Sequence, residues 1–439
     1  MPRMPSPALL ERLRGRLGGR SLLGGALQLL AGHLLRMLIQ SAYFILTTRG
    51  LGVEDYGRYT GQQALLLGLV PFTNLGYPIL ALREVARDSR GRAAIWSDGL
   101  RVTLVVGGAL SLALAAFGPA LLRVDFPRLP LLMLAVAELI FYALINLLSG
   151  IMQGAQRLDR MAQIEVALAL ARLAAVAAVA LAGELHLASF AAAHLAGSGL
   201  CLLAALAVLG RGWAWPLAPA SWPEIRRRLR DGLYVAGAAA GRNFHVGLDK
   251  MLLPSLAGLA AAGQYAAGFR VFAFALLPVQ ALMSALYPRF FQQRQGSFAG
   301  SLALWRRSAP LVLAYALPVS AIVWAAAPLL GPILGSEYPE APQVLRALIW
   351  VLVLQGLYLP LGDALSGADF FGFRSACIFA AAAANLGLNL LLIPRQGWQG
   401  AVIAVYLSHA LLLLLYAWGA RRALLRERRQ VQAQERRHG

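Results

Sequence analysis

The sequence predicts an all-α integral membrane protein with about twelve transmembrane helices in two six-helix lobes, and three observations support that fold class. The chain of 439 residues is 59% hydrophobic and only 14% charged, which makes it far more apolar than an ordinary soluble domain. Apolar runs of about 20 residues, long enough to cross the hydrocarbon core of a bilayer, recur between short polar breaks. Arginine is abundant in every second break and scarce in the others.

Twelve spans account for the apolar runs when their limits are set at the polar breaks. We place them at residues 21–48, 60–82, 96–122, 129–153, 161–182, 187–210, 233–255, 263–286, 304–330, 344–365, 375–393 and 399–420. The longest internal polar segment contains prolines and an arginine run, and it divides the spans six and six. We therefore predict an N-terminal lobe, a cytoplasmic connector, a C-terminal lobe and a basic cytoplasmic tail at residues 1–210, 211–231, 232–421 and 422–439.

The formal net charge of +20 is explained by where the arginines lie. Basic residues such as Arg83 and Arg228 follow every second span, whereas the alternate breaks carry acidic residues such as Glu54 and Glu337. Because Lys and Arg accumulate in cytoplasmic loops, both termini are expected in the cytoplasm. The charge is therefore attributed to topology, with solvated loop arginines, and no nucleic-acid partner is expected.

The sequence offers little that would support catalysis. It contains no Gly-rich nucleotide loop and no metal-ligand spacing, so neither a cofactor nor a metal is expected. Cys201 and Cys377 both fall within apolar spans and are expected to be packing residues. The outer loops are too short to carry the placed acids and bases of a catalytic centre. We expect a protein that is not an enzyme.

The two halves of the chain align with each other at an offset of 206 residues, which sets Gly57 against Gly263 and Gly52 against Gly258. Both halves begin with a span that leaves the cytoplasm. We therefore predict a parallel repeat related by an axis along the membrane normal, a transporter design in which the substrate site lies between the halves.

The first span carries a polar stripe. Its members, spaced so that they share one face of a helix, are His33, Arg36, Gln40 and Tyr43. An ionisable group at the centre of a bilayer helix costs about 2.5–3.5 kcal/mol on insertion scales, so Arg36 needs water or a partner. Arg36 is interpreted as an anion contact, with a structural ion pair as the alternative. His33 is interpreted as a hydrogen-bonding residue, with titration near neutral pH as the alternative.

The seventh span repeats the pattern, since the offset sets Arg36 against Arg242. Arg242, His245 and Asp249 share a stripe, and the only lysine of the chain, Lys250, lies about 80° around the helix. We expect Asp249 to hold Arg242 or to exchange a proton, and not to pair with Lys250, because neighbours in a helix point apart.

Three further polar residues in the spans are expected to have partners or ligands. Lys250 is expected to contact the ligand or to extend toward the outer interface. Arg270 in the eighth span is a fourth candidate cation, with burial against an acid as the alternative. Glu138 and Arg172 are expected to form a structural pair between the fourth and fifth spans.

Four stretches give the chain a family resemblance. They are Leu-Gly-Val-Glu-Asp-Tyr-Gly-Arg-Tyr at 51–59 with Arg-Glu-Val-Ala-Arg at 83–87, Leu-Asp-Lys-Met-Leu-Leu at 248–253 with Gly-Gln-Tyr-Ala-Ala at 263–267, the segment 361–373, and Asn-Leu-Gly-Leu-Asn-Leu-Leu-Leu-Ile-Pro at 385–394. On these residues the chain resembles the oligosaccharide flippases, which export O-antigen and related polysaccharides within the multidrug/oligosaccharidyl-lipid/polysaccharide (MOP) superfamily.

The resemblance implies two six-helix lobes in a V shape and a central cationic cavity. Arg36, Arg242, Lys250 and Arg270 would bind a pyrophosphate or sugar there, and Asp249, His33, Gln40, Tyr43 and His245 would add polar or coupling groups. It also implies a task, by alternating access: moving an undecaprenyl-pyrophosphate-linked oligosaccharide to the outer leaflet of a bacterial inner membrane. Partners would be the bilayer and polysaccharide polymerase or ligase machinery.

Two other function classes stay open. A drug or cation antiporter of the same superfamily would be expected to favour acidic cavity residues, whereas the ionisable residues in these spans are mostly basic. A membrane glycosyltransferase or ligase acting on the same lipid-linked sugars would require a catalytic constellation on substantial outer loops.

Overall fold

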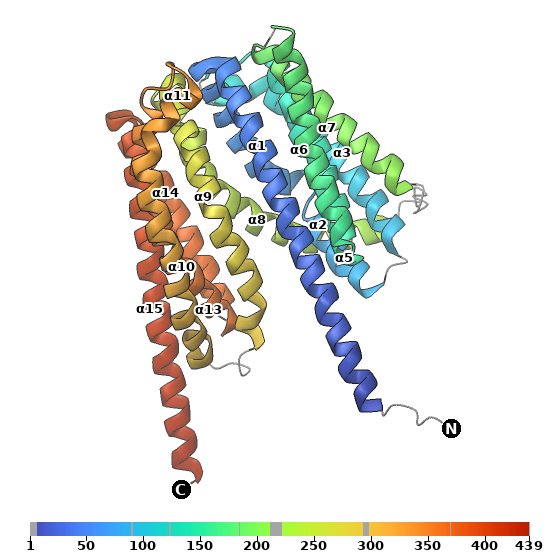
Figure 1. The fold of residues 1–439 in the computed structure, drawn as a ribbon, viewed down its shortest axis with the longest axis vertical. Helices are drawn as coiled ribbons and strands as arrows, with labels where there is room; N and C mark the ends of the chain where they lie inside the picture. The colour runs from blue at the N-terminus through green and yellow to red at the C-terminus, as the bar shows by residue number, and fades with distance from the viewer. Residues whose placement is uncertain are drawn as a thin grey trace. The chain divides into compact units, whose positions relative to one another are not determined.

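The computed structural model describes residues 7–88, 91–122, 124–183, 185–210, 222–292, 298–368 and 370–438, and every regular element in these ranges is a helix (Figure 1). The first half contains α1 (Pro7–Thr73), α2 (Tyr77–Arg87), α3 (Arg92–Leu122), α4 (Arg128–Val136), the π-helix η2 (Ala137–Tyr142), α5 (Ala143–Gly154), α6 (Leu158–Leu181) and α7 (Leu187–Gly210). The second contains α8 (Trp222–Leu256), α9 (Leu259–Gln292), α10 (Phe298–Ala326), the short η3 (Ala327–Leu329) and α11 (Leu330–Leu334), α12 (Ala341–Leu348), α13 (Val351–Gly367), α14 (Phe371–Gln396) and α15 (Trp398–His438).

The described helices are those of a multi-pass membrane protein. By length and composition, nine could cross a membrane, or ten if the bent pair Leu35–Thr73 and Tyr77–Arg87 counts as one span. The difference from the predicted twelve lies partly in α1, which carries two predicted spans, and partly in α8. Helix α8 covers the predicted seventh span but is not among the nine, because polar residues such as Arg242 and Asp249 lower its hydropathy.

Helix α1 consists of two helical stretches joined at Gly52, whose φ of 74° and ψ of 173° are not helical. Only glycine adopts this backbone region readily, so the break is written into the sequence. Glu337 caps the second stretch, because its Oε2 accepts a hydrogen bond of 3.1 Å from the backbone N–H of Val53. A carboxylate at a helix N-terminus accepts a hydrogen bond from a free N–H group, and its negative charge interacts favourably with the positive end of the helix dipole.

The chain divides into two compact units. The first comprises Met1–Leu46, Phe72–Ala116 and Arg128–Ala236, and the second comprises Thr47–Pro71, Phe117–Pro127 and Gly237–Gly439. This division follows a different line from the predicted lobes 1–210 and 232–421, which remain a prediction. Of the predicted connector, residues 211–221 lie outside the described residues, and residues 222–231 form the first turns of α8. Over the predicted tail, α15 continues as a helix to His438.

In the first unit, α2 packs on α5, and α6 packs on α7. Gly150 allows the first of these contacts, because a Cβ there would lie 2.3 Å from the carbonyl oxygen of Pro78. The expectation that all loop arginines are solvated is wrong for Arg228, which is only 5% exposed. Its Nη1 lies 2.6 Å from Asp98 and its Nη2 lies 2.8 Å from Glu84. Burial alone would lower the pKa of Arg228, but the hydrogen bonds and charge of Glu84 hold it above its ordinary value.

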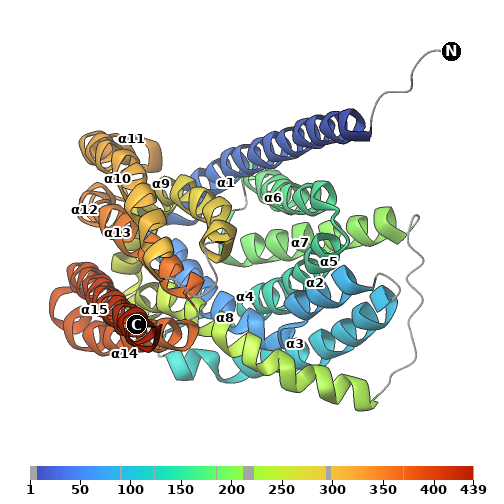
Figure 2. The same ribbon diagram turned by 90° about the horizontal axis from the view of Figure 1, so that it is seen from below.

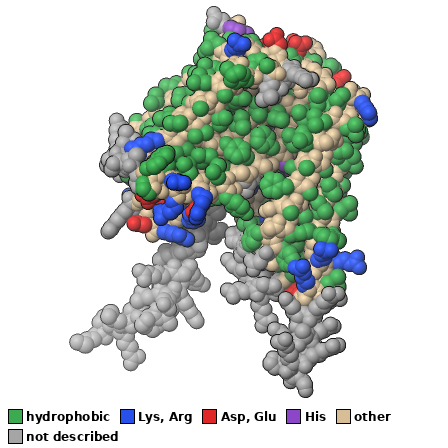
Figure 3. Space-filling view, turned by 180° about the vertical axis from the view of Figure 1, so that it is seen from behind, with side chains coloured by type: hydrophobic (Ala, Val, Ile, Leu, Met, Phe, Trp, Pro, Cys, Tyr) green, Lys and Arg blue, Asp and Glu red, His purple; other side chains and the backbone are tan. Residues whose placement is uncertain are grey.

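In the second unit, α9, α10, α13, α14 and α15 run side by side (Figures 1 and 2). Asn385 of α14 donates to Ser408 of α15 over 3.1 Å and so links the two helices. Cys201 in the first unit and Cys377 in the second are free and buried, as expected of packing residues. Hydrophobic side chains cover most of the face shown in Figure 3. Large apolar residues such as Leu181 are exposed, as lipid-facing residues must be.

A close backbone contact in the second unit joins residues that correspond to each other in the internal repeat. A Cβ on Gly57 would lie 2.1 Å from the carbonyl oxygen of Leu259, and a Cβ on Gly263 would lie 2.0 Å from that of Val53. At the offset of 206 residues, Gly57 corresponds to Gly263 and Val53 corresponds to Leu259. The two contacts are therefore the same contact with the partners exchanged, which is the signature of a twofold relation.

We predict that Gly57→Ala and Gly263→Ala each destabilise the protein by about 1–3 kcal/mol, since each methyl group would overlap a backbone carbonyl. The measurement is the melting temperature of the purified protein in detergent. Gly387→Ala is the matched control, because nothing lies within 4 Å of its added Cβ. Equal melting temperatures for all three variants would contradict the tight contact.

Candidate functional site

A cavity of about 550 Å³, lined by both polar and apolar residues, lies within the second unit, among α8, α9, α13 and α14. Arg242 of α8, predicted from the sequence as an anion contact, lines it. Its side chain is exposed and forms no ion pair or hydrogen bond with the residues that the structure describes. Asp249, which was expected to hold it, bonds elsewhere. Arg242 is thus a cation available to a ligand in the cavity.

The same cavity is lined by a second arginine that the sequence did not single out. Arg374 of α14 places Nη2 3.1 Å from Oδ1 of Asp363 on α13 and donates from Nη1 to Ser366 over 2.7 Å. Ser284 and Tyr287 of α9 and Ser375 of α14 are further polar residues of the lining. The only sequence signal for this pair was an aspartate inside an apolar span, since nothing in the spacing links it to Arg374.

Asp249 and Lys250 are arranged differently from the prediction. Lys250 Nζ lies 3.0 Å from Oδ1 of Asp249, 2.7 Å from the carbonyl oxygen of Val246 and 3.4 Å from the centre of the Phe269 ring. The expectation that the neighbours would not pair is therefore wrong, because the long lysine side chain folds back across its own helix. Tyr265 donates a hydrogen bond to the other oxygen of Asp249. The charge of Lys250 is balanced within the protein.

His245 and Arg270 complete the predicted set in the second unit. The ring of His245 stacks on that of His409, with centroids 5.8 Å apart. Arg270 lies over the ring of Phe274, with Cζ 5.2 Å from its centre. It has no carboxylate partner among the described residues, so the expected alternative of burial against an acid is not what the structure shows.

In the first unit, the α1 stripe contacts α6 and α7. Arg36 donates to Glu165 of α6, with both side chains 29% exposed. The hydroxyl of Tyr43 lies 2.8 Å from Nδ1 of His194 on α7. Gln40 is partly buried, and the side chain of His33 lies outside the described residues. Glu165 and His194 were not identified from the sequence.

A buried polar network extends from Tyr43 through His194. Nε2 of His194 lies 2.8 Å from Oε1 of Glu138, and Nη2 of Arg172 lies 2.9 Å from the same oxygen. The expected pair of Glu138 and Arg172 is therefore confirmed. Arg172 also donates from Nε to Ser198 over 2.9 Å. Glu138 lies in the π-helix η2, and such turns are often found at functional sites.

Comparisons with known proteins identify a family and a fold for the chain. The sequence model of a family described as polysaccharide biosynthesis protein matches residues 22–293. A curated protein described as a probable low-salt glycan biosynthesis flippase, from Haloferax volcanii, is 24% identical over 199 residues. That match covers 45% of this chain and 42% of the relative, so less than half of the relative's length is spanned.

Solved structures show the same fold at low identity. An inward-facing multidrug resistance MATE family transporter of the MOP superfamily superposes with a TM-score of 0.71 at 15% identity, over 89% of this chain and 96% of that one. An outward-facing structure of such a transporter gives 0.61 at 16% identity, over 92% and 96%. A MOP superfamily transporter from Pyrococcus furiosus gives 0.61 at 17% identity, over 90% and 94%. The predicted MOP-type fold is confirmed.

We predict that Glu138→Ala lowers the stability of the protein by about 3–5 kcal/mol, because it leaves Arg172 buried without its carboxylate. The measurement is thermal unfolding in detergent. Asp159→Ala is the control, since its partner Arg157 and Asp159 itself are 44% and 48% exposed and such pairs contribute about 0–1 kcal/mol. Similar losses in both variants would argue against a structural role for the network.

Proposed function

The chain belongs to the polysaccharide biosynthesis protein family, and from this premise we propose that it is a flippase for a lipid-linked oligosaccharide. The substrate we propose is an undecaprenyl-pyrophosphate-linked sugar, moved from the cytoplasmic to the outer leaflet of a bacterial inner membrane by alternating access. The MOP transporter fold and the relative described as a flippase support a transporter rather than an enzyme. Polymerase or ligase machinery would then use the sugar on the outer side.

The observation that carries this proposal is the position of Arg242 in the cavity without a carboxylate of its own among the described residues. Moving a charged head group through hydrocarbon is slow because the group loses its hydration. A guanidinium group replaces part of that hydration, since its planar fork donates two parallel hydrogen bonds to phosphate oxygens. A drug or cation antiporter would gain nothing from an unpaired arginine at this place.

The other predicted cations take different proposed roles. We assign Arg270 to the ligand as well, because it also lacks an acidic partner among the described residues. Arg36, paired with Glu165 and 29% exposed, can reach an anion only by sharing that carboxylate. Lys250 is proposed to contribute least, since Asp249 and the Phe269 ring already hold its charge.

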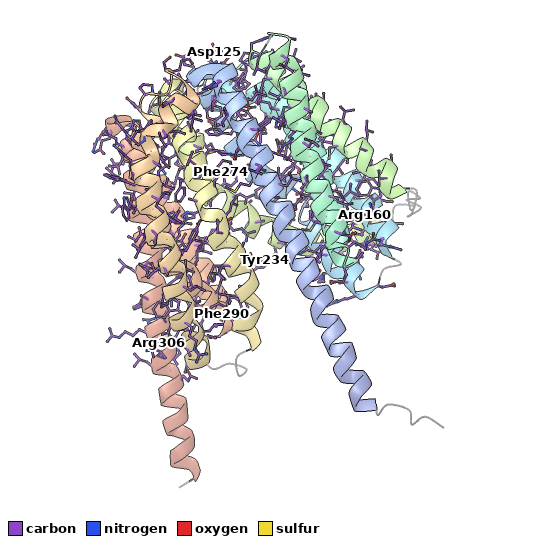
Figure 4. All side chains as sticks on the ribbon, in the orientation of Figure 1. Asp125, Arg160, Tyr234, Phe274, Phe290 and Arg306 are labelled. Atoms are coloured by element: carbon purple, nitrogen blue, oxygen red, sulfur yellow. The ribbon has the colours of Figure 1, made fainter. Side chains whose placement is uncertain are left out.

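The proposed orientation places both termini in the cytoplasm. Within the second unit, Asp125 lies near one end and Arg306 lies toward the other (Figure 4). This separation fits the arginine-rich breaks of the sequence on the cytoplasmic side and the acidic breaks outside.

We predict that Arg242→Ala reduces flipping of a fluorescent undecaprenyl-pyrophosphate oligosaccharide in liposomes at least tenfold, since it removes the unpaired cation of the cavity. Arg242→Lys should retain part of the rate, because lysine keeps the charge but loses the fork. Arg306→Ala is the matched control, an exposed arginine of α10 in the same unit and outside the cavity (Figure 4).

Three outcomes would change the proposal. Unaltered flipping by Arg242→Ala, with wild type active, would keep the function and move the site away from this cavity. Loss in Arg36→Ala alone would move it to the first unit. A wild type that flips no lipid-linked sugar but extrudes a cationic dye would favour the antiporter.

A further inference from the structure

Arg374 and Asp363 line the cavity, and one donor of Arg374 lacks the hydrogen bond that a purely structural ion pair would provide. In a buried structural pair, the remaining donors and acceptors are normally satisfied. Here the Nε–H of Arg374 is buried and has no hydrogen-bond partner among the described residues. Such an unmet donor is unfavourable, because it has lost its hydration without gaining a hydrogen bond in return. The pair is therefore incomplete on the side of Arg374.

Three side chains act on the guanidinium group: Ser366, Asp363 and the hydroxyl of Tyr416 on α15. Nη1 donates to Ser366, which is fully buried and fixes the orientation of the group. Nη2 lies against a single oxygen of Asp363. Nε and one terminal nitrogen together form the edge that pairs with two oxygens of a phosphate. An anion that binds this edge would satisfy Nε and compete with Asp363 for Nη2.

The charge of the cavity leads to the same conclusion. Its lining contains the guanidinium groups of Arg242 and Arg374 and the carboxylate of Asp363, a formal balance of one positive charge. Each of the two phosphates in a lipid-linked pyrophosphate carries one negative charge. Both charges are balanced only if both arginines bind the ligand and Asp363 gives up Arg374.

We propose that Arg242 and Arg374 bind the pyrophosphate together, and that Asp363 is a displaceable counter-ion of Arg374. This proposal rests on the proposed function and assigns the residues that bind and release the head group. Asp363 neutralises Arg374, whose side chain is 24% exposed. When the pyrophosphate enters, it takes the Nε edge, and when it leaves, Asp363 recovers the guanidinium group.

The counter-ion makes binding reversible. Two arginines without an acid would hold a doubly charged head group tightly and release it slowly, whereas transport requires that binding be strong enough for entry and weak enough for exit. Removing the charge of Asp363 should therefore tighten binding and slow transport at once. A purely structural role would weaken or leave unchanged both quantities.

The test compares wild type, Asp363→Asn, Arg374→Ala and Arg374→Lys, each as the full chain in nanodiscs. Binding is measured with farnesyl diphosphate, farnesyl monophosphate and inorganic pyrophosphate, and flipping is measured separately in liposomes. We expect Asp363→Asn to bind farnesyl diphosphate about tenfold more tightly and to flip more slowly. Arg374→Ala should bind it about tenfold more weakly, and Arg374→Lys should recover only part of that loss. Farnesyl monophosphate should respond less to Asp363→Asn.

Controls separate binding from folding and from the proposed function. Arg346→Ala removes an arginine that lies over Trp324, outside the cavity, and should change neither the binding nor the flipping rate.

If Asp363→Asn keeps its melting temperature but binds farnesyl diphosphate no more tightly than wild type, the counter-ion role of Asp363 is refuted. If wild type flips the sugar and Asp363→Asn, Arg374→Ala and Arg374→Lys flip it at the same rate, this inference is refuted and the proposed flippase function is retained. Tighter binding by Asp363→Asn in a protein that flips no sugar would refute the flippase and retain the anion site. Equal binding of inorganic pyrophosphate and farnesyl diphosphate would identify a free anion as the ligand.

Discussion

The cost of placing charge in apolar surroundings governs the polar interior of both units. In the first unit the cost is met by pairing: Glu138 binds both Arg172 and His194, and Arg228 binds Asp98 and Glu84. Each of these groups would be strongly destabilising alone, and together they hold helices that otherwise contact each other through apolar side chains. Pairing is thus the rule in the interior, and a cation that breaks the rule requires a different explanation. Arg242 is such a cation, since it lines a cavity and forms no ion pair with a carboxylate among the described residues.

The internal repeat relates the unpaired Arg242 to a paired arginine in the other half of the chain. The glycine contact around Gly57 and Gly263 shows that the offset found in the sequence is a structural relation within the second unit. At that offset Arg36 and Arg242 correspond to each other, yet their surroundings differ. Arg36 pairs with Glu165, whereas Arg242 has no acidic partner among the described residues. Corresponding positions of the repeat therefore supply a paired arginine in one half and an available arginine in the other.

The sequence was sufficient for the fold and for part of the site. Hydropathy and arginine spacing predicted a helical multi-pass protein, and the stripe on α8 identified Arg242, because both signals are local. Partners across helices were harder to predict. Asp363 and Arg374 lie on successive helices and meet only after the chain turns back between them, so no periodicity connects them. The geometry of Lys250 was misjudged for another reason: helical position fixes Cα and Cβ, and four rotatable bonds then let the ammonium group return to Asp249. The count of candidate spans is below twelve because polar residues lower the hydropathy of α8 and because α1 carries two predicted spans.

The different chemistry of lysine and arginine explains why Lys250 and Arg374 take different roles. Lysine presents a compact charge, and Lys250 has its donors directed to Asp249 and to a backbone carbonyl with its charge over an aromatic ring. A second anion would have to replace these partners outright. A guanidinium group has separate edges, so Arg374 can keep Ser366 on one terminal nitrogen while the opposite edge changes from a carboxylate to a phosphate. Exchange of partners without exposure of a bare charge is therefore possible for Arg374, and this is the property that a reversible site for an anionic head group needs in a membrane interior.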